Sequence, residues 1–359
     1  MTTVRTFTSS VLGPADRGRE FGEHHREEVA RTVAAYRRLF HARATRPFDV
    51  DLWAERAWQH IHDVAPEASD EIRGIAEGAG LPVREIAALN ARTELLAIAD
   101  PTGVGDGECS TVVALPPGRP PVAVQTWDWY DAMSENWLQW EIPHPDGRVV
   151  RTVTEYGVLG KIGVNSYGVG VLFNMLRHAD DAEDDLGFPV HLLSRHILDT
   201  ARDLDEALLA TSSVKTSAST SLTVVEGRPD TGRTVSVELF PGGPGLVEPE
   251  RDVLVRTNHF VSADGKGGCL ASTIGPGSEI RRAKLLSSFE KRPPQSAREV
   301  VDAMHDHAEV GGVCAHPDQS LDPVLRHATL ATVAVDAARS RLHVTPGGPC
   351  ASRDGGRAG

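Results

Sequence analysis

The spacing of apolar and polar positions predicts a helical first third of the chain. Apolar residues return every three or four positions, the repeat of an amphipathic helix, in three ranges: 16–44, 50–79 and 82–98. The second range ends at a glycine-rich helix stop that includes Gly80, and the third opens at Pro82. We therefore expect helices in all three ranges and turn material in residues 99–108.

The pattern changes after residue 109 to short β-branched runs separated by glycine and proline, which is typical of strands. The predicted strands cover 110–117, 121–129, 149–157, 168–174, 220–227, 233–241, 252–260, 328–336 and 341–347. Helical spacing returns at 188–213 and at 277–308, where KRPPQS (291–296) interrupts it. The tail, CASRDGGRAG (350–359), is expected to be disordered.

Helices that are segregated from strand pairs indicate packed antiparallel sheets covered by helices, which is an α+β fold. The shift in composition at 99–109 is the one persuasive internal boundary. We therefore expect an N-terminal helical segment, 1–108, and a core, 109–359. A chain of 359 residues is long enough to bury a sizeable core.

Charge and hydropathy narrow the classes of partner. The net charge of −13 repels phosphate backbones, so nucleic acid is not an expected partner. No run approaches the roughly 18 apolar residues of a membrane span, and the first 20 residues lack the apolar stretch of a signal peptide. We expect no membrane association and a cytoplasmic location.

The metal-binding and cofactor-binding motifs that a sequence can reveal are missing from this chain. Its four cysteines form no C-x-x-C pair, and its 15 histidines include no H-E-x-x-H. There is no P-loop and no strand-linked GxGxxG. We therefore expect no metal, no disulfide framework and no cofactor.

The stretch GDGECSTVV (105–113) is the strongest candidate for chemistry. A free cysteine is usually a small buried hydrophobe, but Cys109 lies at a bend between a glycine-rich loop and a strand, where a nucleophile is useful. A thiol nucleophile needs a base, and no motif nominates a histidine. The cysteine's own α-amine, with a pKa of about 7.7–8.0, would serve if the Glu108–Cys109 bond were cut.

Several motifs then follow in order along the chain. They are GREFG (18–22), GECST (107–111), QTWDW (125–129), GKIGVNSYGVGVLFN (160–174), SLTVVEGRPDTGRTVSVELFP (221–241), RTNHF (256–260), SEIR (278–281) and VCAHP (313–317). In this combination the sequence resembles the N-terminal-nucleophile (Ntn) hydrolases, and within them the peptidase C45 family of acyl-coenzyme A:6-aminopenicillanic acid acyltransferase. The resemblance implies a four-layer αββα sandwich with a helical N-terminal segment and self-cleavage between Glu108 and Cys109.

The resemblance also implies catalytic roles. Cys109 matches the nucleophile, and Asp128 matches an aspartate that polarises its amine or thiol. Asn258 matches the oxyanion-hole amide, and Asn174 matches a position whose backbone N–H donates to the same hole. The alternatives are a strand-end acid and strand-end asparagines that satisfy the backbone.

An arginine near the nucleophile completes the implied set. Arg281 matches it, and the adjacent Arg282 is an alternative match. The other explanation for either residue is an ordinary solvated arginine on a helix. Three aromatic residues, Trp127, Trp129 and Tyr130, are candidates for substrate binding. With Trp137 and Trp140 they could line an acyl pocket, although core packing explains such a cluster as well.

Three positions depart from the family pattern. Thr126 stands where asparagine is usual, and Glu108 stands where glycine is often found. Ala315 replaces an arginine that is tied to the site of the penicillin enzyme, which puts the penicillin reaction itself in doubt for this chain.

The first functional hypothesis is a self-processing N-terminal-cysteine amidohydrolase or acyltransferase acting on a small N-acylated metabolite or thioester. The resemblance allows a coenzyme A thioester as co-substrate, and the N-terminal fragment is expected to remain bound as the partner in an αβ heterodimer. Two alternatives remain open. One is an uncleaved cysteine thioesterase or acyltransferase with a histidine base such as His259, and the other is a non-catalytic binding relative.

Overall fold

The N-terminal part of the protein is helical, as the spacing predicts. The computed structural model describes residues 3–102, 109–181, 184–274 and 276–354. Its first helices are α1 (Pro14–His24), α2 (Arg26–Arg43), α3 (Val50–Val64), α4 (Pro66–Ala79), α5 (Val83–Asn90) and α6 (Arg92–Ala99). Each predicted range is thus split in two. Between α3 and α4 the reason is Pro66, which has no N–H to donate and therefore begins a helix.

Within the described residues, the strands form two sheets. The larger has the order β1 (Thr6–Thr8), β4 (Trp137–Pro143), β5 (Val149–Glu155), β6 (Ile162–Asn165), β7 (Val169–Met175), β8 (Thr220–Gly227), β9 (Gly232–Leu239) and β10 (Gly245–Val247). The smaller has the order β11 (Val253–Arg256), β2 (Ser110–Ala114), β3 (Val122–Tyr130), β12 (His327–Asp336) and β13 (Arg341–Pro346). The pairing is antiparallel as expected, except that β1 lies parallel to β4. The strands β1, β4, β6 and β10 were not predicted.

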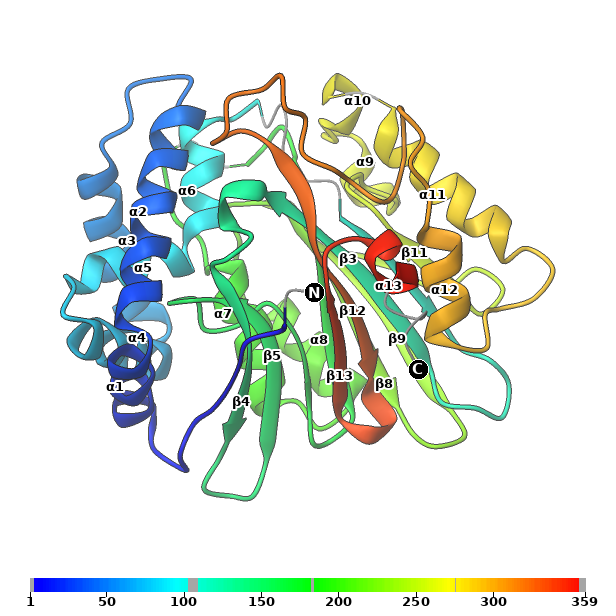
Figure 1. The fold of residues 1–359 in the computed structure, drawn as a ribbon, viewed down its shortest axis with the longest axis horizontal. Helices are drawn as coiled ribbons and strands as arrows, with labels where there is room; N and C mark the ends of the chain where they lie inside the picture. Colours follow the sequence, from blue (N-terminus) through cyan, green and yellow to red (C-terminus); the bar gives the residue numbers. More distant parts are fainter. Residues whose placement is uncertain (1–2, 103–108, 182–183, 275, 355–359) are drawn as a thin grey trace.

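Four layers result from these elements. The sheets face each other through contacts of β2 with β7 and of β12 with β6. The helices α7 (Val190–Thr200) and α8 (Leu204–Ser212) pack on the larger sheet, and α11 (Gly277–Ser288) and α12 (Ala297–Met304) pack on the smaller one. Figure 1 shows α1–α6 gathered on one side of the sheets and α9–α12 on the opposite side. The predicted αββα sandwich with a helical N-terminal segment is confirmed.

The C-terminal tail differs from the expectation. Residues Pro349–Asp354 form helix α13, which packs against α12 and β13, and residues after 354 lie outside the described part. The short helices α9 (Ala263–Lys266) and α10 (Ala271–Ile274) complete the fold. Among the described helices, none combines the length and the apolar character needed to cross a lipid bilayer.

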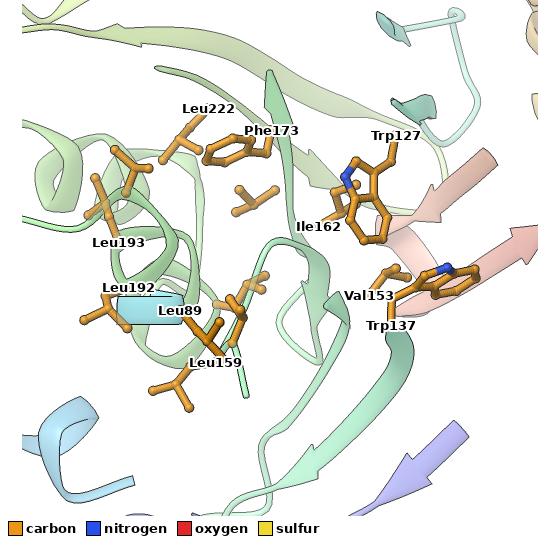
Figure 2. Close-up of a cluster of buried hydrophobic side chains, with 14 of the residues drawn as sticks. Leu89, Trp127, Trp137, Val153, Leu159, Ile162, Phe173, Leu192, Leu193 and Leu222 are labelled. Carbon is orange, nitrogen blue, oxygen red and sulfur yellow. The ribbon is translucent and has the colours of Figure 1, made fainter. Parts of the chain in front are cut away.

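One hydrophobic core joins the N-terminal helices to the sheets. Figure 2 shows Leu89 of α5 in the same cluster as Leu159, Leu192 and Trp127. Leu89 lies over Gly157, where a Cβ atom would be 2.7 Å from its Cδ1. Because the two parts share this core, the segment 1–108 is held to the rest of the protein by apolar burial.

Alternation along β2 aims the candidate nucleophile at the interior. Val112 and Ala114 face the helices α11 and α12, whereas Cys109 and Val113 belong to the core between the sheets. Successive side chains on an extended segment point to opposite faces. Cys109, which directly precedes β2, therefore points toward the larger sheet.

Candidate active site

Cys109 is held by the backbone of the neighbouring strand. Its side chain is 5% exposed. The Sγ atom donates to the carbonyl oxygen of Asp128 and accepts from the N–H of Asp128, both at 3.4 Å. This contact follows from the register, since Ser110 of β2 lies opposite Thr126 of β3. The thiol is thus fixed in position beside Asp128, as the sequence predicts, but without a side-chain base bonded to it.

A small cavity lies in front of the thiol. Its volume of about 10 Å³ is room for roughly one water molecule. The residues that line it are Arg92, Cys109, Trp127, Asp128, Trp129, Lys161, Phe173 and Met175. A metabolite does not fit there, so access by a substrate requires this cavity to open.

The surroundings keep the Cys109 thiol protonated. Burial raises the pKa of Cys109 to about 12, and the negative charge of Asp128 acts in the same direction. The positive charges of Lys161 and Arg281 oppose this rise. Because the thiolate is the reactive form, the thiol needs a proton acceptor before it can attack.

Lys161 is a candidate for that acceptor, and the sequence reasoning gave it no role. Its Nζ atom lies 4.1 Å from the ring centre of Trp127 and 3.7 Å from Oε2 of Glu155. Burial and the like charge of Arg92 lower the pKa of Lys161 to about 7, against the opposing effect of Glu155. The signal available in the sequence was the GKIG motif at 160–163, which was matched to the family without a function for its lysine.

The N-terminal segment contributes directly to this site. Arg92 of α6 is buried and forms an ion pair with Glu155, and Tyr36 of α2 donates a hydrogen bond to the same carboxylate. Trp129 Nε1 donates to the Tyr36 hydroxyl at 2.8 Å. Burial would raise the pKa of Glu155, but Arg92 and Lys161 outweigh it, so the pKa is lowered and the carboxylate stays ionised.

Asp128 lies next to the start of β2. The hydroxyl of Thr126 accepts from the N–H of Ser110 at 3.1 Å and lies 3.4 Å from Oδ2 of Asp128. The carboxylate is therefore close to the chain end that cleavage before Cys109 would create. Thr126, one of the departures from the family pattern, forms this link. The predicted cleavage partner Glu108 lies outside the described residues.

Asn174 contacts the nucleophile through its side chain. Its Nδ2 donates to the carbonyl oxygen of Cys109 at 3.0 Å, and its Oδ1 accepts from the hydroxyl of Thr111 at 2.8 Å. We expected a backbone N–H of this residue to serve an oxyanion hole. That role stays a prediction, and the structure adds a contact of the side-chain amide, which holds the carbonyl group of Cys109 in place.

Asn258 and Arg281 form a pair beside Met175, a residue that lines the cavity. Arg281 is buried and donates to Oδ1 of Asn258 at 3.0 Å, while Nδ2 of Asn258 donates to the carbonyl of Met175 at 2.9 Å. Met175 lines the cavity, so Asn258 is one residue removed from it. Arg282 bonds Glu250 at 2.6 Å on the outside, so Arg281 is the arginine that faces the site.

The predicted aromatic residues divide between cavity and core. Trp127 and Trp129 line the cavity. Tyr130 is fully buried against Trp129 and His327, with ring centres 4.9 and 4.2 Å away, and does not line it. Trp140 packs against Phe21 in the shared core, with ring centres 4.3 Å apart, which is the packing explanation for that residue.

His259 is not placed to activate Cys109. Its Nδ1 lies 2.8 Å from the hydroxyl of Ser278, and burial together with the charge of Arg256 lowers its pKa to about 4. Among the described residues that line the Cys109 cavity there is no histidine. A histidine-activated thiol is therefore not the arrangement seen here.

A larger cavity of about 780 Å³ lies between the N-terminal helices and α7. It contains none of the predicted site residues, and several of its charged lining residues are paired with one another. Arg195 donates to Asp199 at 2.9 Å and to Glu71 at 3.0 Å, and Arg17 donates to Glu71 at 2.6 Å. We place the candidate active site at the Cys109 thiol, the candidate nucleophile, and not at this larger cavity.

Two of the solved structures that this chain matches are distantly similar to it. A Caenorhabditis elegans orthologue of N-acylethanolamine-hydrolyzing acid amidase is 13% identical, with a TM-score of 0.45 over 66% of this chain and 100% of that one. Penicillin V acylase from Agrobacterium tumefaciens is 15% identical, with a TM-score of 0.45 over 66% of this chain and 83% of that one.

Comparison with known sequences identifies the family of this chain. The 40 kDa form of acyl-coenzyme A:6-aminopenicillanic-acid-acyltransferase from Emericella nidulans is 33% identical over 189 residues, which is 50% of each chain. The chain thus matches about half the length of this curated relative. The family model for acyl-coenzyme A:6-aminopenicillanic acid acyl-transferase matches residues 116–349, a range that begins after Cys109. The chain therefore belongs to the acyl-coenzyme A:6-aminopenicillanic acid acyl-transferase family, whose model matches more than half of it.

Proposed function

We propose that this protein is a self-processing N-terminal-cysteine amidohydrolase or acyltransferase with Cys109 as its nucleophile. The observation that carries the proposal is the position of the thiol. It lies directly before β2, faces a closed cavity beside Asp128 and Lys161, and has its carbonyl group fixed by Asn174. Membership of an acyltransferase family supports the same conclusion.

The first step is cleavage before Cys109. Neutral Lys161 accepts the thiol proton, and the sulfur attacks the carbonyl carbon of Glu108. The C–N bond breaks, the nitrogen takes up a proton, and a thioester joins Glu108 to the Cys109 sulfur. Water then hydrolyses this thioester, which leaves a carboxylate on Glu108 and restores the thiol. The products are a fragment of 108 residues and one that starts at Cys109.

The second stage is catalysis by the new chain end. The α-amine of Cys109 becomes the base for its own thiol, and Asp128, beside the start of β2, stabilises the ammonium form of that amine. The thiolate attacks the acyl carbon of a substrate and the leaving group departs with a proton. The amide of Asn258, oriented by Arg281, stabilises the oxyanion of this step.

The substrate class follows from the acyl-enzyme. A small N-acylated metabolite or a thioester delivers its acyl group to Cys109, and water or an amine takes it away. A coenzyme A thioester is a co-substrate consistent with the names of the family and of its relative. Ala315 places a methyl group where the penicillin enzyme has an arginine, so we do not assign the penicillin reaction to this chain.

The two fragments stay associated after cleavage. The shared core and the ion pair of Arg92 with Glu155 join residues on the two sides of position 109. Arg195 of the second fragment also bonds Glu71 of the first at 3.0 Å. Separating the fragments would leave these charges without their partners, and it would expose the apolar side chains around them to water.

Mass spectrometry of the purified protein tests self-processing. We expect two masses that correspond to residues 1–108 and 109–359, and a Cys109→Ala variant that keeps the single mass near 38.6 kDa. An active enzyme with only the intact mass contradicts cleavage at this bond.

Trapping of the acyl-enzyme tests the nucleophile and the substrate class. The cleaved enzyme is incubated with a panel of N-acyl amines and acyl thioesters, and the reaction is quenched. The acyl adduct is then located by peptide mapping. We expect it on Cys109. Cys269→Ala is the matched control, because that free cysteine lies outside the site and should not affect labelling. Loss of turnover in His259→Ala with cleavage intact would instead favour a histidine base.

A further inference from the structure

Four soft ligands meet at the C-terminal end of the protein, outside the Cys109 site. They come from three separate segments: the residues after α12, the VCAHP loop, and α13. Among the described residues, their ligand atoms all lie within 4.8 Å of one another. We call them the Cys₂His₂ cluster: His307, Cys314, His316 and Cys350.

Four of the distances within the cluster are close to the edges of a tetrahedral metal site. Sγ of Cys314 lies 3.4 Å from Sγ of Cys350, and each sulfur lies 3.7 Å from Nε2 of His316. The two imidazole Nε2 atoms, of His316 and His307, are 3.1 Å apart. Zinc bonds of about 2.3 Å to sulfur and about 2.0–2.1 Å to nitrogen give tetrahedral edges of about 3.3–3.8 Å.

The backbone around the cluster holds the ligands in place. The carbonyl oxygen of Asp306 accepts from the N–H groups of Val313 and Cys314, both at 3.0 Å, which ties the segment of His307 to the loop of Cys314. On the other side the chain approaches closely at Gly348, where a Cβ atom would lie 2.4 Å from Sγ of Cys314. A glycine is needed there for α13 to bring its cysteine to the cluster.

We propose that the Cys₂His₂ cluster is a structural zinc site that holds one Zn²⁺ ion. Two thiolates and two neutral imidazoles balance the charge of the ion, so binding releases two protons from the thiols. Four protein ligands fill the tetrahedron and leave no position for a substrate, which is the pattern of structural sites. Soft thiolate and imidazole donors in tetrahedral geometry favour zinc over magnesium or calcium.

The site connects the C-terminal helix to the strand next to the candidate active site. Ala315, between two of the ligands, donates to the hydroxyl of Thr329 at 3.0 Å and accepts from its N–H at 3.0 Å. Thr329 of β12 lies opposite Asp128 of β3. Zinc would therefore fix the loop that packs beside Asp128, and α13 with it.

This proposal departs from the expectation of no metal. The sequence spacing gave no sign of the site, because the ligands lie at 307, 314, 316 and 350 with no C-x-x-C pair. The hairpin of β12 and β13 separates the last cysteine from the others along the chain and returns it to them in space.

Metal analysis of the full-length protein, purified without chelator, tests the proposal. Inductively coupled plasma mass spectrometry should find about one zinc per chain, and cobalt(II) added to chelator-stripped protein should give the visible and thiolate charge-transfer bands of a tetrahedral site. Cys350→Ser and His307→Ala should each weaken zinc binding by at least about 10-fold.

Controls distinguish a built site from incidental binding. Cys269→Ser and His343→Ala remove one thiol and one exposed imidazole elsewhere, and both should retain zinc and the cobalt spectrum. Circular dichroism confirms that each variant is folded. Stripped wild-type protein that takes up neither metal overturns the proposal. So does a Cys314–Cys350 disulfide, seen as a mass lower by two hydrogen atoms in fresh metal-free protein, and so does zinc retained in both ligand variants.

Discussion

Cys109 and Cys314 are both buried thiols, and burial raises the pKa of each to about 12. Their neighbours differ in kind. Cys109 shares its cavity with the charged groups of Lys161 and Asp128. The described lining of that cavity contains no second thiol and no imidazole, and its one other sulfur atom is the thioether of Met175. Cys314 lies within 3.4 Å of a second thiol and 3.7 Å of an imidazole.

The comparison shows that burial alone does not assign a role to a cysteine. A lone thiol beside an amine with a pKa of about 7 can lose its proton to that amine and attack a carbonyl carbon. A thiol beside another thiol and two imidazoles is suited to a soft metal ion. The predictions below test this division of roles.

The largest effect is expected at the nucleophile. Cys109→Ala should abolish self-cleavage and lower kcat/KM by at least about 10⁴-fold, because the described lining of the cavity contains no second thiol and no hydroxyl to replace the sulfur. Cys314→Ala should still cleave itself. Cleavage is followed by denaturing gel and intact mass. Equal loss of cleavage in both variants would remove the distinction between the two thiols.

The next effect concerns the amine that sets Cys109 apart. Lys161→Met should slow self-cleavage by roughly 10²–10⁴-fold, the range of general acid–base catalysis. In the wild type the cleavage rate should rise with pH through about 7, because Lys161 is protonated below that pKa and can accept the thiol proton above it.

The pH profile separates this role from simple packing. The rise near neutral pH should disappear in the methionine variant and should persist in Cys350→Ser. Rates are measured by quench and gel densitometry on freshly refolded or newly synthesised precursor. A Lys161→Met precursor that cleaves at the wild-type rate with the same pH profile would show that Lys161 is not the acceptor.

A smaller effect is expected at Asn258. Asn258→Ala should lower kcat by roughly 10²–10³-fold with little change in KM, since an oxyanion donor acts mainly in the transition state. Arg282→Ala is the matched control for the pair that Asn258 makes with Arg281, because Arg282 bonds Glu250 on the outside. Steady-state kinetics on the cleaved enzyme compare kcat and KM of the Asn258→Ala variant with those of the Arg282→Ala control.

The smallest effect is expected from the metal cluster. Removal of zinc, or Cys350→Ser, should lower Tm by roughly 3–8 °C while self-cleavage continues. Differential scanning fluorimetry with and without added Zn²⁺ measures the shift. An unchanged Tm on metal removal would contradict a stabilising role for the bound zinc.

Much of the fold could be read from periodicity. The three-to-four-residue repeat found the N-terminal helices, and the β-branched runs between glycine and proline found β3 and β12 at the centre of the smaller sheet. The splits at His25 and Pro66 were missed, as were short strands such as Thr6–Thr8. A three-residue strand carries too little pattern, and β1 exists only because it pairs with β4.

Parts of the candidate site could also be read from the sequence. Cys109 and Asp128 lie together because their strands are consecutive and pair in antiparallel register, so a local motif carried the contact. Tyr130 was predicted to bind substrate and is instead core, because the cavity ends at Trp129. The hydrogen bond from the side chain of Asn174 to the carbonyl of Cys109 could not be read from the motif.

The sequence by itself determined where the helices and strands lie, where the nucleophile stands before β2, and which family the motifs resemble. These features depend on neighbours in the chain or on a motif kept in order. Only the tertiary structure decided that Lys161, Glu155 and Arg92 converge on Cys109, that Arg281 and not Arg282 faces the site, and that Cys350 returns to Cys314. Such contacts depend on strand order and on how the layers pack, because groups far apart in the chain meet only when their apolar faces are buried together.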